Sequence, residues 1–305
     1  MAIKKNQLFR HALILLVFLL LAAGPSIAAA AEWSVSLQTR ELFPGGVGRV
    51  EISPGEKVAS ASVIWNGSLI RLMPLKKESF TAFFGIPRDE KPGEKTLELT
   101  VTGQDGQVTR DMFSFQVLPR EFPVQRLTLP ESKVTLDQAS LERHQREQRM
   151  LEKMFAGLRP DPLWQEAFII PVEGKVLSQF GFQRILNGKP RSPHSGVDLR
   201  AAMGQPVAAS AGGVVVLAEE HFFSGKSVYI DHGMGIVTMY FHLSEFKVRP
   251  GDRVETGQTI GLAGSTGRST GPHLHWGARV HGVKVDPLTL TAATGARDSG
   301  PEKEG

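Results

Sequence analysis

The sequence predicts a mainly β protein, with an N-terminal immunoglobulin-like β-sandwich, a connecting helix and a second β-domain. The prediction rests on three observations. Short alternating segments between turn residues fill 32–120, a charged helical stretch spans about 137–158, and strand-like segments with glycine loops return over 163–290. A chain of 305 residues is long enough for two modest domains.

The first 31 residues are predicted to be a secretory signal peptide. Lys4, Lys5 and Arg10 precede the apolar run ALILLVFLLLAAG, and the small residues of PSIAAAA follow it. A membrane span needs ~20 apolar residues, so we expect cleavage near Ala31 and no stable span in the mature chain. An uncleaved N-terminal anchor is the alternative.

Removal of residues 1–31 changes the charge balance. The whole chain has 35 Lys and Arg against 31 Asp and Glu, and the leader contains three of the basic and none of the acidic residues. The mature chain is therefore close to neutral, which gives no support for nucleic-acid binding. Because the chain has no cysteine, a zinc site in it must use His, Asp or Glu ligands.

Residues 32–120 are expected to form a β-sandwich accessory domain. The segments WSVSLQT, GRVEIS, VASASVIWNG, SFTAFFGIP, KTLELTVTG and RDMFSFQVL alternate or are rich in β-branched and aromatic residues, and turns such as KPGE and GQDGQ separate them. About seven strands in a domain of this length are typical of an immunoglobulin-like sandwich.

Residues 121–162 are expected to form a linker that contains the helix of about 137–158. Asp137 is its predicted N-cap, and Gly157 with Pro160 ends it. Its charges lie on most faces, which favours a docking or spacer helix between the domains. The tail 291–305 is small and polar and is expected to be disordered.

Two histidines lie one residue apart in the segment GPHLHWGARV. Alternate residues of a strand share a face, so Leu274 and Trp276 would face the core while His273 and His275 lie side by side over a groove. Taken alone, the pattern also fits two exposed strand histidines.

The segment GIVTMYFHLSEF predicts a second strand of the same kind. Val237, Met239 and Phe241 alternate with Tyr240 and His242. We therefore expect the first set in the core, and Tyr240 and His242 together on the open face.

A third segment, RSPHSGVDL, places His194 four residues before Asp198. Pro193 and Gly196 argue against a helix, and a straight strand would separate the two side chains by ~13 Å. A turn that brings His194 back toward Asp198 would let both reach one ion. A carboxylate in such an apolar segment is costly unless it is paired or bound to metal.

These segments together predict a catalytic zinc site. Three protein ligands and one open position describe such a site; His194, Asp198 and one of the pair His273 and His275 would supply the ligands. Zinc lowers the pKa of bound water toward ~7, and a further imidazole can accept the proton. Another imidazole, or Tyr240 as a contact of the substrate or oxyanion, could stabilise the developing charge.

The stretch from FIIPVEGKVLSQFGFQR to VKVDPLTL resembles the lysostaphin-type, or LytM-like, zinc metallopeptidases, which cut peptide bonds in peptidoglycan. The matching motifs are HSGVD, YFH and GPHLHW, with intervening patterns such as SQFGFQR, GQPVAASAGGVV and YIDHGMG. The resemblance implies that 163–290 is an antiparallel β peptidase domain of the duplicated hybrid motif type, with a groove over its larger sheet. The domains ahead of it look like those of exported Gram-negative members, which implies the periplasm or cell envelope.

The resemblance also implies a role for each site residue. The zinc ligands fall on His194, Asp198 and His275, with one zinc ion per chain. The general base falls on His273, and a second catalytic histidine, thought to steady the transition state, falls on His242. The spacing alone leaves an exchange of roles between His273 and His275 open.

The expected function is zinc-dependent hydrolysis of peptide cross-links in bacterial peptidoglycan stem peptides, with zinc-bound water as the nucleophile. The D-alanyl–diaminopimelate bond suits a Gram-negative member and a glycine bridge suits the lysostaphin relatives; the motifs do not decide between them. One alternative is a non-catalytic wall-bound activator of a peptidoglycan amidase. Another is a latent enzyme inhibited by its N-terminal domain or linker helix.

Overall fold

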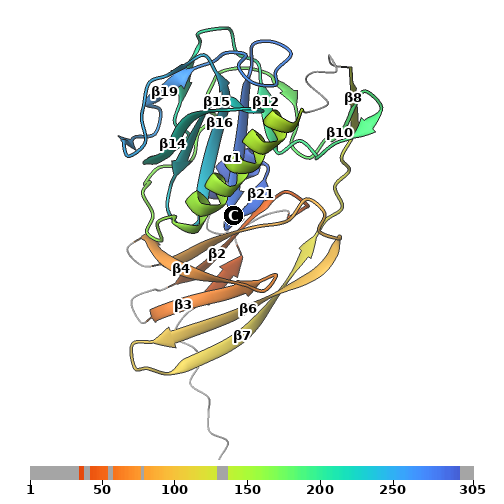
Figure 1. Cartoon of the computed structure of the whole chain (residues 1–305). Helices are drawn as coiled ribbons and strands as arrows, with labels where there is room; N and C mark the ends of the chain where they lie inside the picture. Colours follow the sequence, from red (N-terminus) through yellow and green to blue (C-terminus); the bar gives the residue numbers. More distant parts are fainter. Residues whose placement is uncertain (1–33, 38–41, 54–57, 77–78, 129–136, 296–305) are drawn as a thin grey trace, which may run out of the picture. The chain divides into compact units, whose positions relative to one another are not determined.

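The structure is a computed structural model that describes residues 34–37, 42–53, 58–76, 79–128 and 137–295 (Figure 1). The predicted signal peptide lies outside these residues. Strands dominate, as the sequence predicts. No helix within the described ranges is both long and apolar enough to cross a membrane.

Seven antiparallel strands form the first β-domain, in the order β1-β2-β5-β4-β3-β6-β7. Their apolar residues meet in one core in which Trp65 packs against Phe84 and Phe115. The immunoglobulin-like topology stays a prediction. The strands are β1 Ser34–Leu37, β2 Val47–Ser53, β3 Val58–Trp65, β4 Ser68–Lys76, β5 Ser79–Gly85, β6 Gly93–Gly103 and β7 Val108–Val117.

The linker contributes one strand and one helix. Strand β8 (Val124–Leu127) pairs in parallel with β10 (Gln183–Leu186) of the second domain, which the sequence did not predict. Helix α1 (Gln138–Ala156) begins where expected, because the Asp137 carboxylate accepts a hydrogen bond from Ser140 N at 2.8 Å.

The second domain is built on an eight-stranded antiparallel sheet in the order β18-β14-β15-β16-β20-β12-β9, with β21 paired to β20. Two three-stranded sheets, β11-β10-β8 and β13-β19-β17, flank it. The strands not yet given are β9 Val176–Ser178, β11 Lys189–Pro190, β12 Gly196–Leu199, β13 Pro206–Ala208, β14 Gly213–His221, β15 Gly225–Asp231, β16 Ile236–Leu243, β17 Glu245–Phe246, β18 Arg253–Val254, β19 Thr259–Leu262, β20 Leu274–Val280 and β21 Val283–Val285.

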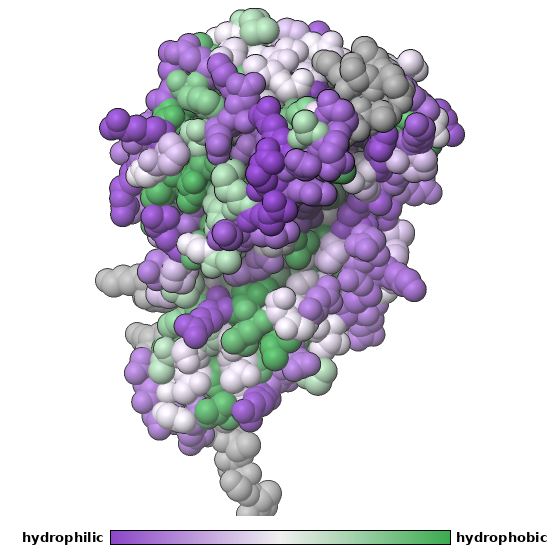
Figure 2. Space-filling model, in the orientation of Figure 1, coloured by the Kyte–Doolittle hydropathy of each residue, from purple (hydrophilic) through white to green (hydrophobic). Residues whose placement is uncertain are grey.

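The two faces of the large sheet have different partners. Leu274, Trp276 and Tyr240 are fully buried in the main core of the domain. On the opposite face Met239 packs with Leu151 of α1, which crosses in front of β16 in Figure 1. The outward side of α1 is hydrophilic in Figure 2. The helix therefore covers part of the sheet face with its apolar side and presents its charges to solvent.

The C-terminal tail is more ordered than expected. Helix α2 (Pro287–Gly295) includes residues 291–295, so the prediction of disorder is wrong there; the remaining tail, 296–305, lies outside the described residues. Asp286 Oδ1 accepts a hydrogen bond from Leu288 N at 3.1 Å, and Pro287 suits the first helical position. Leu290 and Ala293 are buried, which holds the helix against the domain.

Candidate active site

Strands β12 and β20 bring the predicted metal ligands together. Asp198 lies opposite His275 in the antiparallel pair. His194 precedes β12 and is fixed by the hydrogen bond of its N–H to Phe182 O at 2.9 Å. Gly196 is required between them, because a Cβ there would lie 2.3 Å from Trp276 O and 2.8 Å from His275 Nε2.

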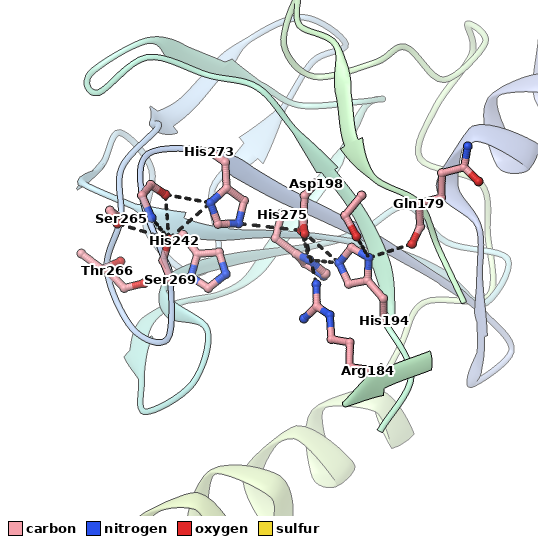
Figure 3. Close-up of polar contacts among 12 residues, drawn as sticks. Gln179, Arg184, His194, Asp198, His242, Ser265, Thr266, Ser269, His273 and His275 are labelled. Atoms are coloured by element: carbon pink, nitrogen blue, oxygen red, sulfur yellow. Dashed lines mark hydrogen bonds and ion pairs between the residues drawn. The ribbon is translucent and has the colours of Figure 1, made fainter. Parts of the chain in front are cut away.

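The three ligand atoms converge on one point (Figure 3). His194 Nε2 lies 2.9 Å from Asp198 Oδ1 and 3.0 Å from His275 Nδ1, and the last two atoms are 2.8 Å apart. Ligand atoms of a tetrahedral zinc site with ordinary bond lengths are about 3.3 Å apart. The cluster therefore fits one zinc ion after a small outward shift of each side chain.

Neighbouring groups fix the orientation of these ligands. His194 Nδ1 donates to Gln179 O at 2.8 Å, which leaves the lone pair of Nε2 directed at the cluster. Arg184 donates to Asp198 Oδ2 at 3.1 Å, so the other carboxylate oxygen remains available. The ring of His275 stacks on Phe241 with an interplanar angle of 6°.

The charge states of the cluster suit a metal cation. Burial opposes ionisation of Asp198, but its close contacts with the His194 and His275 rings outweigh it and hold the pKa of this carboxyl well below its ordinary value. Burial lowers the pKa of His275 to about 4, despite the opposing effect of Asp198. At neutral pH the cluster therefore presents an anionic carboxylate and a neutral His275 imidazole, the forms that bind zinc.

His273 and His242 lie beside the cluster, on the side away from Gln179 in Figure 3. Their ring centroids are 4.8 Å apart. His273 Nε2 is 3.8 Å from Asp198 Oδ1, while Nδ1 donates to Gly271 O at 2.8 Å. His242 Nδ1 donates in the same way to Thr266 O at 2.8 Å. In each neutral ring, Nε2 is therefore left as a proton acceptor.

The predicted faces of β16 are wrong from Val237 to Phe241, because a β-bulge interrupts the alternation, whereas His242 lies on the face that the sequence predicts. The register against β15 shifts between Lys226 and Val228, and His242 has a φ of 64°. The bulge turns His242 toward the same face as Phe241 and His275. The residues Val237, Met239 and Phe241, expected in the main core, instead face the groove side.

Tyr240 consequently points away from the cluster, and its expected contact with substrate or oxyanion is not supported. The side chain is fully buried. Its hydroxyl oxygen accepts hydrogen bonds from Ser210 N at 2.7 Å and Thr238 Oγ1 at 2.9 Å. Thr238 in turn contacts His232 Nε2 at 2.7 Å, so Tyr240 belongs to a buried structural network.

Sequence reasoning assigned no role to Arg184, Phe241 or Thr266, although all three touch site residues. Arg184 stands in SQFGFQR, one of the patterns that carry the resemblance, which was the one available signal. Phe241 was assigned to the wrong face, and Thr266 acts through its backbone carbonyl, which no side-chain pattern can reveal.

Comparisons with known proteins agree with this geometry. The profile of peptidase family M23 matches residues 192–287. A crystal structure assigned to peptidase M23 from Pseudomonas aeruginosa has 30% sequence identity and a TM-score of 0.63, over 83% of this chain and 96% of that one. The chain belongs to peptidase family M23. This confirms the expected family, and with the His-Asp-His cluster it supports zinc as the cofactor.

Curated relatives match over shorter stretches. Peptidoglycan DD-endopeptidase ShyA of Vibrio cholerae is 41% identical over 137 residues, or 44% of this chain and 31% of the relative. DD-carboxypeptidase/endopeptidase Mpg of Neisseria meningitidis is 46% identical over 101 residues, or 33% of this chain and 23% of the relative. The matched region thus spans less than a third of the length of these curated relatives.

Proposed function

We propose that the chain is a zinc-dependent endopeptidase that hydrolyses peptide cross-links of bacterial peptidoglycan. The observation that supports this most strongly is the convergence of His194, Asp198 and His275, with His273 and His242 beside them. The relatives named as peptidoglycan DD-endopeptidases support the substrate class.

His273 is the proposed general base. A bound zinc ion would polarise the scissile carbonyl and lower the pKa of an attacking water toward ~7. His273 Nε2 accepts a proton from that water, because Nδ1 is held by Gly271 O. The water oxygen bonds to the carbonyl carbon, the C–N bond breaks, and His273 returns the proton to the leaving amine.

His242 is proposed to steady the transition state. Burial and the neighbouring His275 and His273 lower the pKa of His242 to about 3, so its resting form is neutral. Negative charge that develops on the carbonyl oxygen would raise this pKa and favour uptake of a proton from solvent by Nε2, which the ring releases again when the charge is lost. A protonated Nε2 can then donate a hydrogen bond to that oxygen.

Helix α1 is proposed to slow the reaction by covering part of the groove. Phe222 N donates to the Glu147 carboxylate at 3.0 Å, and Arg143 donates to Glu220 O at 2.9 Å. Buried Leu151 packs over the sheet face that also contains Phe241, the stacking partner of a proposed ligand. A substrate strand laid along this face would have to displace α1.

The test of α1 is Leu151→Ala, with Leu141→Ala as the matched control. Leu141 lies near the other end of α1 and its side chain is exposed. Loss of a buried leucine costs about 2–5 kcal/mol, which weakens docking of α1, so cleavage should accelerate only in Leu151→Ala. Equal rates in both variants and the unmodified chain, with Leu151→Ala still folded, would contradict inhibition by α1.

The function itself is tested on purified sacculi. The unmodified chain and Leu151→Ala should convert cross-linked muropeptide dimers to monomers, as measured by mass spectrometry. His273→Ala should retain zinc but lose cleavage, whereas His281→Asn, a partly exposed turn substitution, should keep both. Bound zinc without cleavage by any of these forms would favour the alternative, a non-catalytic activator of an amidase.

The proposed substrate places the protein in the cell envelope. We propose that the segment 1–31 directs export of the chain to the periplasm. We also propose that residues 32–120 form the accessory domain, 121–162 the linker and 163–290 the peptidase domain, to which helix α2 adds residues 291–295. Detection of a mature N-terminus near residue 32 in an envelope fraction tests the proposed export. An intact N-terminus in that fraction would indicate the uncleaved anchor instead.

A further inference from the structure

One threonine connects the strand that carries His242 to its neighbour. Thr266 belongs to the loop between β19 and β20, and its side chain reaches the point where β15 begins and β16 ends. The hydroxyl donates to Leu243 O at 2.7 Å and accepts from Lys226 N at 2.9 Å. Lys226 and Leu243 face each other across the two strands. The hydroxyl therefore joins the backbones of a facing pair.

The strands need a support at this point, because the end of β16 is irregular. The register of β15 against β16 shifts between Lys226 and Val228. His242 has a φ of 64°, in the left-handed region, which is strained for a residue other than glycine. Such a backbone persists only where surrounding contacts hold it. The hydroxyl of Thr266 and the hydrogen bond from His242 N to Ser224 O at 2.9 Å are contacts of this kind.

The same threonine also holds the ring of His242. The carbonyl oxygen of Thr266 accepts the Nδ1 proton of His242 at 2.8 Å (Figure 3). The hydroxyl thus fixes the backbone beside His242, while the carbonyl fixes its ring and its tautomer. A displacement of Thr266 would move the ring relative to His273, whose ring centroid lies 4.8 Å from that of His242.

The loop around Thr266 has little room to relax. A Cβ at Gly225 would lie 2.3 Å from Thr266 Oγ1, and a Cβ at Gly267 would lie 2.3 Å from Gly225 N. Both glycines have positive φ values, of 62° and 69°, which suit glycine. Arg268 N also donates to Phe223 O at 2.8 Å in the turn before β15. Close backbone contacts therefore set the position of the Thr266 hydroxyl.

We propose that Thr266 is a positioning residue of the active site, whose hydroxyl holds the bulge that presents His242 to the metal centre. The inference rests on the proposed role of His242 and extends it to a side chain outside the histidine cluster. Serine supplies the same donor and acceptor, whereas valine resembles threonine in shape but has no hydroxyl. The two substitutions therefore isolate the hydroxyl.

The kinetic experiment compares Thr266→Val and Thr266→Ser in the full zinc-loaded chain. With cross-linked muropeptide dimers, Thr266→Val should lower kcat by about tenfold to a hundredfold, as expected for a catalytic group displaced by up to ~1 Å. KM should stay within about twofold, because His242 is proposed to act in the transition state. Thr266→Ser should recover most of kcat. An unchanged kcat in Thr266→Val, or no recovery in Thr266→Ser, would overturn the proposal.

Thr238→Val is the matched control for a merely structural effect. Thr238 lies on the same strand, is fully buried, and donates from Oγ1 to the Tyr240 hydroxyl at 2.9 Å. Both valine variants should lower the free energy of unfolding, but only Thr266→Val should lower kcat. Zinc affinity, measured by competition with a chelator, should be unchanged in both. Equal losses of kcat in the two variants, or weaker zinc binding in Thr266→Val, would overturn the assignment to His242.

A spectroscopic measurement separates this inference from the proposed function. The Nδ1 proton of His242, which is buried and hydrogen-bonded, should give a slowly exchanging imidazole resonance in NMR spectra of the full chain, identified by its loss in His242→Ala. Its exchange should accelerate in Thr266→Val and slow again in Thr266→Ser.

The outcomes of the two experiments are distinct. If no form cleaves the dimers while the resonance responds as expected, the proposed function fails and the positioning role stands. If the unmodified chain cleaves but Thr266→Val matches it in kcat and in proton exchange, the positioning role alone fails. Absence of the resonance from the unmodified chain would also overturn the positioning role.

Discussion

Tyr240→Phe separates a structural role of the tyrosine hydroxyl from a catalytic one. The hydroxyl accepts hydrogen bonds from Ser210 N and Thr238 Oγ1 on the buried side of β16. Its removal leaves the Ser210 N–H, which is buried, without the acceptor that it has in the described part of the chain. Thr238 keeps its contact with His232.

The magnitude follows from the unpaired donor. A buried donor left without a partner costs about 1–3 kcal/mol. We therefore expect Tyr240→Phe to lower the free energy of unfolding by that amount, while kcat/KM on cross-linked muropeptides stays within about twofold of the unmodified chain. The phenol pKa, raised by burial, also argues against proton transfer by Tyr240.

Two assays on the same preparation decide the matter. Denaturant unfolding of the zinc-loaded protein measures stability, and muropeptide analysis measures cleavage, with His242→Ala as the variant expected to lose activity. A large loss of kcat/KM in Tyr240→Phe without loss of stability would refute the placement of its hydroxyl in the core.

Three further predictions follow from the site and its supports. Asp198→Asn should abolish stoichiometric zinc binding, measured by elemental analysis, because the cluster loses its anionic ligand; near-stoichiometric zinc would contradict the ligand set. Gly196→Ala should lower the free energy of unfolding by about 1–3 kcal/mol and weaken zinc binding, because the added Cβ would overlap Trp276 O. An unchanged free energy of unfolding together with an unchanged zinc affinity would contradict this close approach of the two strands. His232, whose pKa burial lowers to about 4, should take up a proton more readily when unfolded. The free energy of unfolding should therefore fall as the pH drops from ~6.5 toward about 4, by up to about 3 kcal/mol, and His232→Gln should flatten this slope.

The sequence predicts β20 well because that strand is regular. Leu274 and Trp276 are buried on one face, and His275 lies on the other, as alternation requires. The meeting of His194 and Asp198 was also predictable, because a buried carboxylate near a histidine needs a partner. These inferences depend on local spacing, which the fold preserves.

The errors arise where tertiary contacts override local spacing. His242 is turned by a bulge whose supports, the carbonyls of Ser224 and Thr266, come from other segments of the chain. No Gly or Pro marks this bulge in the sequence. The helical order of 291–295 likewise depends on burial of Ala293 against the domain, which the composition of the tail does not reveal.

The most direct test of the central claim is zinc-dependent loss of cross-linked dimers from purified sacculi. The unmodified chain and Leu151→Ala are loaded with zinc, stripped with a chelator and reloaded, and dimers are quantified at each stage. We predict cleavage with zinc, none after stripping, and recovery on reloading, but no recovery in Asp198→Asn. Cleavage that survives stripping, or no cleavage by either zinc-loaded form, would contradict a zinc endopeptidase centred on His194, Asp198 and His275.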